Sequence, residues 1–202
     1  KDDNTWQISN ANKAKTITYQ VNDTYDIEET HDIFSPAGSN IEAGKNFMIN
    51  THAFIGYFEG FAQNPYELTI LHPEQLWGAT ALTDLDASKN KDVFVINRYA
   101  SLVEHPIMYA QPDYTTFTVQ GMEILIAVYS PNRKVTAASI TPEMKQMMTA
   151  QKNFLGDFNA TKKYAVLLYL SDNTKPDAEG FGALEHPTST TVVMPEMLPI
   201  DE

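Results

Sequence analysis

Short runs of β-branched and aromatic residues, separated by turn-forming residues, fill most of the first 130 positions. We expect strands at 16–21, 46–51, 53–58, 66–71, 93–96, 107–109, 115–119 and 124–129. Short strands at this spacing are typical of an antiparallel β-sandwich or a strongly curved sheet. Residues 15–130 are therefore predicted to form a β-rich N-terminal domain, after a disordered or poorly ordered polar tail at residues 1–14.

The pattern changes after residue 130. Thr141, Pro142 and Glu143 are residue types that favour the start of a helix, and apolar residues then recur at helical spacing as far as Gly156. We therefore expect a helix over about 141–155, a strand at 164–170 and a further strand at 182–194. The predicted fold class is mainly β, with the helix and the last strands opening a second domain over 131–202.

The charge and the composition exclude several kinds of partner and site. Lys and Arg together number 14 and Asp and Glu 26, so the formal net charge is −12. Such an acidic surface repels phosphate groups, so no nucleic acid partner is expected. No apolar run is long enough for a helix that crosses a bilayer, so no membrane-spanning segment is expected. The chain has no Cys, which excludes disulfides and Cys nucleophiles.

Residues 180–186 read Gly-Phe-Gly-Ala-Leu-Glu-His and lie between two runs of strand-forming residues. Small residues at these positions leave a backbone that another chain can approach closely. An exposed strand of this kind can bind a peptide through main-chain hydrogen bonds, and the Glu185 carboxylate can hold a positively charged end. The same residues are also compatible with an ordinary glycine-rich turn that carries a surface carboxylate.

Histidines and aromatic residues give weaker indications. The five histidines are His31, His52, His72, His105 and His186, and no two have the spacing of a helical zinc pair. His72 and His105 each precede Pro and are expected in surface loops. The aromatic run of Phe54, Tyr57, Phe58, Phe61 and Tyr66 is expected mainly to fill the core, although it could also line a carbohydrate groove.

Residues 182–186, followed by Ser189 and Thr190, resemble the Gly-Gly-Leu-Glu-His segment of the glycyl aminopeptidase-like family of zinc metallopeptidases, which usually also carry a PDZ domain. Upstream segments that look like the N-terminal domain of that family follow in the same order, at 34–38, 41–50, 56–60, 65–68 and 78–80. The resemblance covers roughly residues 15 to 196. It implies a β-rich N-terminal domain packed against a thermolysin-like α+β catalytic domain.

The resemblance also implies roles for single residues. Glu185 would bind the α-ammonium group of a peptide substrate, and the backbone of Gly182, Ala183 and Leu184, with His186 after them, would form the docking strand. In the family, the helix with two zinc-binding His and a general-base Glu lies downstream. This chain ends at Glu202 before any such helix. We therefore expect the N-terminal part of a longer zinc aminopeptidase, which holds no metal and hydrolyses nothing alone.

The expected partners are the N-terminus of a peptide substrate and the remaining catalytic and PDZ domains of the parent chain. The sequence departs from the family at Ala183, at Pro187 and at 104–106, where Glu-His-Pro replaces an Asp-Ser-Pro-like element. Two other functions stay open: a non-catalytic β-sandwich module that binds carbohydrate or peptide, and a structural domain in which Glu185 has no role. The start at Lys1 suggests an exported bacterial protein, periplasmic, outer-membrane-anchored or extracellular.

Overall fold

The computed structural model describes residues 5–25, 33–156, 160–172 and 174–196. The first part of the chain contains η1 (Ala11–Lys13), η2 (Ser35–Ala37), β1 (Asn40–Glu42), β2 (Asn46–Ile49), α1 (Thr51–Phe54), β3 (Tyr66–Leu71), β4 (Trp77–Ala79), β5 (Lys91–Ile96), α2 (Tyr99–Val103) and β6 (Ile107–Ala110). The second part contains β7 (Tyr114–Val119), β8 (Met122–Tyr129), α3 (Ala137–Leu155), β9 (Lys163–Ser171), β10 (Gly182–His186) and β11 (Ser189–Pro195). The prediction of a mainly β chain with antiparallel sheets is confirmed.

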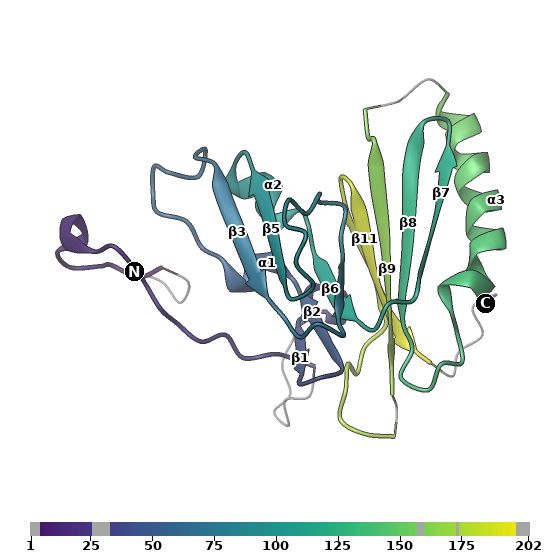
Figure 1. The fold of residues 1–202 in the computed structure, drawn as a ribbon, viewed down its shortest axis with the longest axis horizontal. Helices are drawn as coiled ribbons and strands as arrows, with labels where there is room; N and C mark the ends of the chain where they lie inside the picture. The colour runs from purple at the N-terminus through teal and green to yellow at the C-terminus, as the bar shows by residue number, and fades with distance from the viewer. Residues whose placement is uncertain (1–4, 26–32, 157–159, 173, 197–202) are drawn as a thin grey trace.

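Three sheets and the long helix are stacked in layers (Figure 1). The antiparallel pair β3–β5 lies at one end, followed by a four-stranded sheet in the order β1-β2-β6-β4. A five-stranded sheet in the order β10-β11-β9-β8-β7 comes next, and α3 covers its far side. The five-stranded sheet is mixed, because β8 pairs parallel with β9 and β9 pairs parallel with β11.

Side-chain alternation gives the four-stranded sheet two buried faces. Met48 and Met108 point towards the five-stranded sheet and pack with Leu125 and Leu167. Their neighbours along the strands, including Phe47 and Tyr109, point the other way and pack against the inner face of the β3–β5 pair. On the far side of the five-stranded sheet, the apolar face of α3 completes a third core cluster. The layers therefore share continuous apolar contacts from one end to the other.

The change from one sheet to the next does not fall at residue 130. β7 and β8 precede that position, yet both pair into the sheet that contains β9. The helix expected to open a new domain is instead the crossover between two parallel strands, β8 and β9. We therefore propose that the boundary between the two parts of the chain lies at residues 111–113, between β6 and β7.

Helix α3 begins earlier than the sequence predicts. Its N-cap is Thr136, whose hydroxyl accepts a hydrogen bond from the Ser139 amide at 3.2 Å. In return, the Ser139 hydroxyl accepts one from the Thr136 amide at 3.1 Å, which completes a capping box. Pro142 thus lies inside the helix instead of at its first position. The predicted end of the helix at Gly156 is confirmed, since this residue has φ 67° and its amide bonds the Lys152 carbonyl.

Three other strand predictions were wrong. Residues 16–21 are not a strand: Thr16 to Gln20 are exposed in an arm that projects from the body (Figure 1), so their alternating pattern has no layer to pack on. Residues 53–58 were expected as a strand, but α1 extends through Phe54 and no strand follows it there. The strand predicted at 182–194 is an antiparallel hairpin of β10 and β11. No helix in the described ranges is both long and apolar enough to cross a membrane.

Candidate functional site

Strand β10 contains all five residues that the sequence singled out: Gly182, Ala183, Leu184, Glu185 and His186. It lies at the edge of the five-stranded sheet and pairs only with β11 in the part of the chain that the structure describes. Ala183 and Glu185 are exposed, whereas Leu184 and His186 are half-buried. Along the strand, successive side chains therefore meet different surroundings on its two faces.

The glycines before and within β10 contact the chain's own N-terminal part. A Cβ atom on Gly182 would lie 2.7 Å from the ring of Phe34, and one on Gly180 would lie 2.8 Å from the Ser35 hydroxyl. The Gly180 amide donates a hydrogen bond to that hydroxyl at 3.0 Å. The sequence interpretation assigned the small residues to contact with another chain. At positions 180 and 182 the close neighbour is instead the chain's own segment around η2. Another chain could therefore approach only residues 183–186 of the strand.

Glu185 faces the side of the sheet that α3 covers. It lines a hollow of about 420 Å³ together with Met144, Met148 and Lys152 of α3, and with Tyr164 of β9. Burial raises the pKa of Tyr164, and the nearby Glu185 carboxylate raises it further. Glu185 itself makes no hydrogen bond or ion pair with any residue that the structure describes. Its carboxylate is thus an exposed acceptor beside a partly apolar hollow.

The opposite face of β10 meets the N-terminal part of the chain. Leu184 and His186 line a second cleft of about 420 Å³, whose other lining residues are Ala37, Asn50, His52, Ala53, Val103 and Glu104. Burial is the main cause that lowers the pKa of His186, and the nearby His105 and His52 lower it further, against the opposing effect of Glu104. The two clefts therefore differ in origin, since the second is formed by α1, α2 and their flanking residues.

His105 holds the hairpin turn in place. Its Nδ1 lies 2.5 Å from the Ser101 carbonyl oxygen, and its Nε2 lies 2.9 Å from the Thr188 hydroxyl in the turn between β10 and β11. The expectation of a surface loop was wrong for His105, which is half-buried, and for His72, which is buried with its ring against Tyr109. Both residues sit before Pro at points where two layers meet, a long-range feature that the local pattern does not contain.

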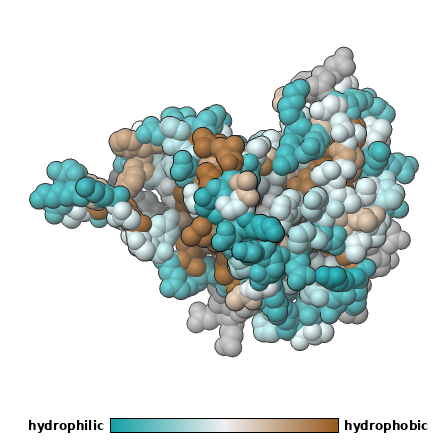
Figure 2. All heavy atoms as spheres, in the orientation of Figure 1, coloured by the Kyte–Doolittle hydropathy of each residue, from teal (hydrophilic) through white to brown (hydrophobic). Residues whose placement is uncertain are grey.

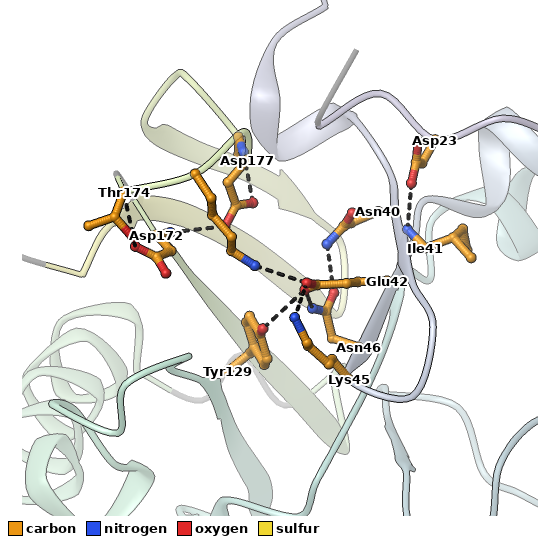
Figure 3. A network of polar contacts seen from close by, with 12 residues as sticks. Asp23, Asn40, Ile41, Glu42, Lys45, Asn46, Tyr129, Asp172, Thr174 and Asp177 are labelled. Carbon is orange, nitrogen blue, oxygen red and sulfur yellow. Dashed lines mark hydrogen bonds and ion pairs between the residues drawn. The ribbon is translucent and has the colours of Figure 1, made fainter. Parts of the chain in front are cut away.

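A polar network fixes the loop that leads into β10 (Figure 3). The Tyr169 hydroxyl donates to Asp177 at 2.8 Å and accepts from the Asn40 amide group at 2.9 Å, so it joins β9, the loop and β1. Glu42 binds both Lys45 and Lys175, the latter at 2.9 Å. Burial raises the pKa of Glu42, but the hydrogen bonds from the two lysines outweigh this and hold it below its usual value. The approach to β10 is thereby tied to the four-stranded sheet.

Metal ligands do not gather in the described residues. No group of three His, Asp or Glu side chains in ranges 5–25, 33–156, 160–172 and 174–196 is placed to hold a metal ion. His52, His105 and His186 come near one another, but the ring nitrogens of His105 already face Ser101 and Thr188. The residues that the structure describes therefore do not form a zinc centre among themselves.

The aromatic run is more exposed than the sequence predicts. Tyr57, Phe58 and Phe61 are each more than half exposed, on the loop between α1 and β3, where Figure 2 shows hydrophobic surface. Only Phe54 and Tyr66 are partly buried. Residues that the sequence analysis did not assign to the site include Asn50, His52, Val103 and Glu104. The one sequence signal for any of these residues is that residues 104–106 differ from the family pattern. Their proximity to β10 arises from the packing of the sheets, which the local sequence does not show.

Comparison with known proteins gives a family for the first part of the chain. Residues 1–111 match the family described as the peptidase M61 N-terminal domain, which ends where β6 gives way to β7. Among solved structures, the fold is similar to that of an aminopeptidase N family protein from Idiomarina loihiensis, with 18% sequence identity and a TM-score of 0.66. The similarity covers 78% of this chain and 27% of that one. No curated protein sequence matches the chain.

Proposed function

The chain belongs to the family of peptidase M61 N-terminal domains, and from this premise we propose that it forms the substrate-docking wall of a longer zinc aminopeptidase. In this proposal the open edge of β10 pairs with the main chain of a peptide substrate. Glu185 binds the α-ammonium group at the end of that peptide. The remaining catalytic and PDZ domains belong to the same parent chain, and zinc is held there.

The observation that carries the proposal is the edge position of β10 with an unpaired carboxylate on it. An edge strand presents main-chain groups that an extended peptide can bind as an added strand. Glu185 is exposed and has no ion pair with the described residues, so its carboxylate is available for an ammonium group. The anchored hairpin turn and the anchored loop hold this strand in one position, which favours a fixed register for the bound peptide.

In this proposal docking is separate from chemistry, and no step of hydrolysis is assigned to the described residues. Glu185 faces the hollow beside α3, whose lining includes Met144, Met147 and Met148. We propose that the remaining catalytic part packs over this hollow, which would place its reacting groups on the Glu185 face of the docked peptide. The contribution of this chain is then to position the peptide end.

Peptide binding to the chain tests the docking role directly. We expect a short peptide with a free N-terminus to bind more tightly than the same peptide after acetylation, as measured by isothermal titration calorimetry. Glu185→Gln should remove that difference, whereas the control Glu67→Gln, at an exposed position on β3, should keep it. In the parent enzyme, Glu185→Gln should raise KM for free-amine substrates and spare amine-blocked ones. Equal effects on both substrates would contradict ammonium recognition.

A second function has one specific observation in its favour. Tyr57, Phe58 and Phe61 form an exposed aromatic surface on the loop between α1 and β3. Exposed aromatic rings suit stacking against sugars or packing against peptides. A carbohydrate- or peptide-binding module would show saturable binding on glycan or peptide arrays that Tyr57→Ala or Phe58→Ala abolishes. Unchanged binding in these variants would remove this candidate.

A further inference from the structure

We propose that the cleft on the Leu184 and His186 face of β10 is a subsite for a basic side chain of the docked peptide. This inference rests on the proposed function, because it requires a peptide along the edge of β10. It adds a second point of recognition, on the opposite face of the strand from Glu185. It also names the substrate class: peptides with Lys or Arg at one particular position near the amino end.

The alternation of a β-strand connects the peptide to both clefts. Side chains of neighbouring strands project on the same face when their residues stand opposite one another. A peptide paired with β10 therefore presents alternate side chains to the hollow beside α3 and to the cleft that contains Leu184 and His186. When the α-ammonium group lies at Glu185, one of the first residues must place its side chain in the second cleft.

The lining of the second cleft suits a long side chain with a cationic end. Its apolar wall consists of Ala53, Val103 and Leu184, and its polar wall includes Asn50 and Glu104. Methylene groups of Lys or Arg can pack on the apolar wall while the charged end reaches the carboxylate. The volume of about 420 Å³ leaves room for such a side chain.

Glu104 is the only carboxylate in the lining of this cleft, and the described residues do not pair with its side chain. The other titratable groups that face the cleft or adjoin it are His52 from α1, His105 after α2 and His186 from β10. Burial lowers the pKa of His186 and so favours its neutral form, which does not offset the negative charge of the Glu104 carboxylate. An acidic side chain would be repelled there, and an uncharged one would leave Glu104 without a partner.

Binding of matched peptides to the whole chain tests the subsite. We would compare free-amine peptides that carry Lys, norleucine or Glu at each of the first three positions, by titration calorimetry at pH 7.5. At one of these positions Lys should bind about tenfold more tightly than norleucine, because its ammonium group can form a charge-assisted hydrogen bond with Glu104. Glu should bind most weakly.

Two variants separate this inference from the docking role. Glu104→Gln should abolish the preference for Lys and keep the preference for a free amine, while Glu185→Gln should do the reverse. Glu67→Gln should leave both preferences unchanged. An unaltered preference for Lys in Glu104→Gln, or its absence in the unmodified chain, overturns the subsite and leaves docking intact. If no peptide binds the chain at all, docking is overturned, and the subsite with it.

Discussion

The inner layers and the outer layers of this molecule are built from similar strands and helices but bury them differently. Strands β6, β8 and β9 lie between other layers, and their runs of residues are almost entirely buried. Strand β3, in the outer pair, alternates between half-buried and exposed residues, and Leu71 at its end is 75% exposed. The outer helix α3 likewise exposes Phe154 and Leu155 on one side.

This contrast shows that coverage by a second layer, more than the composition of a strand, decides how much of it is buried. β3 and β9 are both rich in apolar residues, but only β9 has layers on both faces. The candidate site combines the two cases, because β10 belongs to an inner sheet but forms its edge and has a neighbouring strand on one side only. Predictions that compare inner with outer positions therefore test whether the layers cover the strands, including β10, in the way described here.

The largest effect is expected from a cavity between the two inner sheets. Leu167 on β9 is fully buried in the cluster that joins them. Leu167→Ala should lower the free energy of unfolding by about 2–5 kcal/mol, measured by urea denaturation. The matched control, Leu71→Ala on the outer strand β3, should change it by less than about 0.5 kcal/mol. A large effect at Leu71 would mean that its face is covered in solution, and would break the contrast.

A smaller effect is expected where an inner strand is in tight contact with its neighbours. A Cβ on Gly78 of β4 would lie 2.8 Å from both the Asp92 carboxylate and the ring of buried Tyr109. Gly78→Ala should therefore cost about 1–3 kcal/mol through overpacking. Gly56→Ala, in the outer loop after α1, meets no atom within 4 Å and should be neutral or slightly stabilising. Equal melting temperatures for the two variants would show that Gly78 is not closely packed.

Outer helix α3 packs on one face only, so its end should depend on local hydrogen bonds. Thr136→Ala removes the capping box at its N-terminus and should cost about 1 kcal/mol. Thr149→Ala, at an exposed position in the middle of the helix, should have little effect. Thermal denaturation followed by circular dichroism would compare them. Equal melting temperatures for Thr136→Ala and Thr149→Ala would contradict a stabilising capping box at Thr136.

The smallest effect concerns His186, at the junction between an inner sheet and the N-terminal part. Its pKa in the folded chain is lowered from the ordinary 6.5, chiefly by burial. The unfolded chain therefore binds the proton more readily than the folded chain. The contribution of neutral His186 to stability is complete above pH 6.5 and is lost as the pH falls below that value. His186→Gln should reduce the loss of stability between pH 7.5 and pH 5.5. His52→Gln, at an exposed position, should change that loss less.

Much of the strand content was predictable, and the failures share a cause. β3, β5, β6, β7, β8 and β9 were expected within a residue or two, because their patterns are long and apolar or alternating. Residues 16–21 have an equally good pattern but pair with no strand in the described chain, and residues 16–20 stay exposed. Helix α3 is predictable from its apolar spacing, but its start is not, because Pro142 is a stronger helix-start signal than the capping pair of Thr136 and Ser139.

The candidate site divides in the same way. The small-residue strand with a carboxylate could be recognised from residues 180–186, and its edge position agrees with that expectation, whereas the role of Glu185 stays a prediction. Phe34 against Gly182 and His105 against Thr188 could not be foreseen, since each contact joins residues more than 80 positions apart. Tests of the docking strand must therefore take account of its supports in the N-terminal part.

Local patterns of apolar, small and charged residues were sufficient to identify a mainly β chain and to draw attention to one acidic strand near its end. Such patterns act over a few residues, where backbone geometry and side-chain alternation set the preference. The stacking of the sheets brought Asn50, His52 and Glu104 next to β10 and assigned Glu185 and His186 to different clefts. Burial and neighbouring charges depend on that stacking, because they arise between segments far apart in the chain.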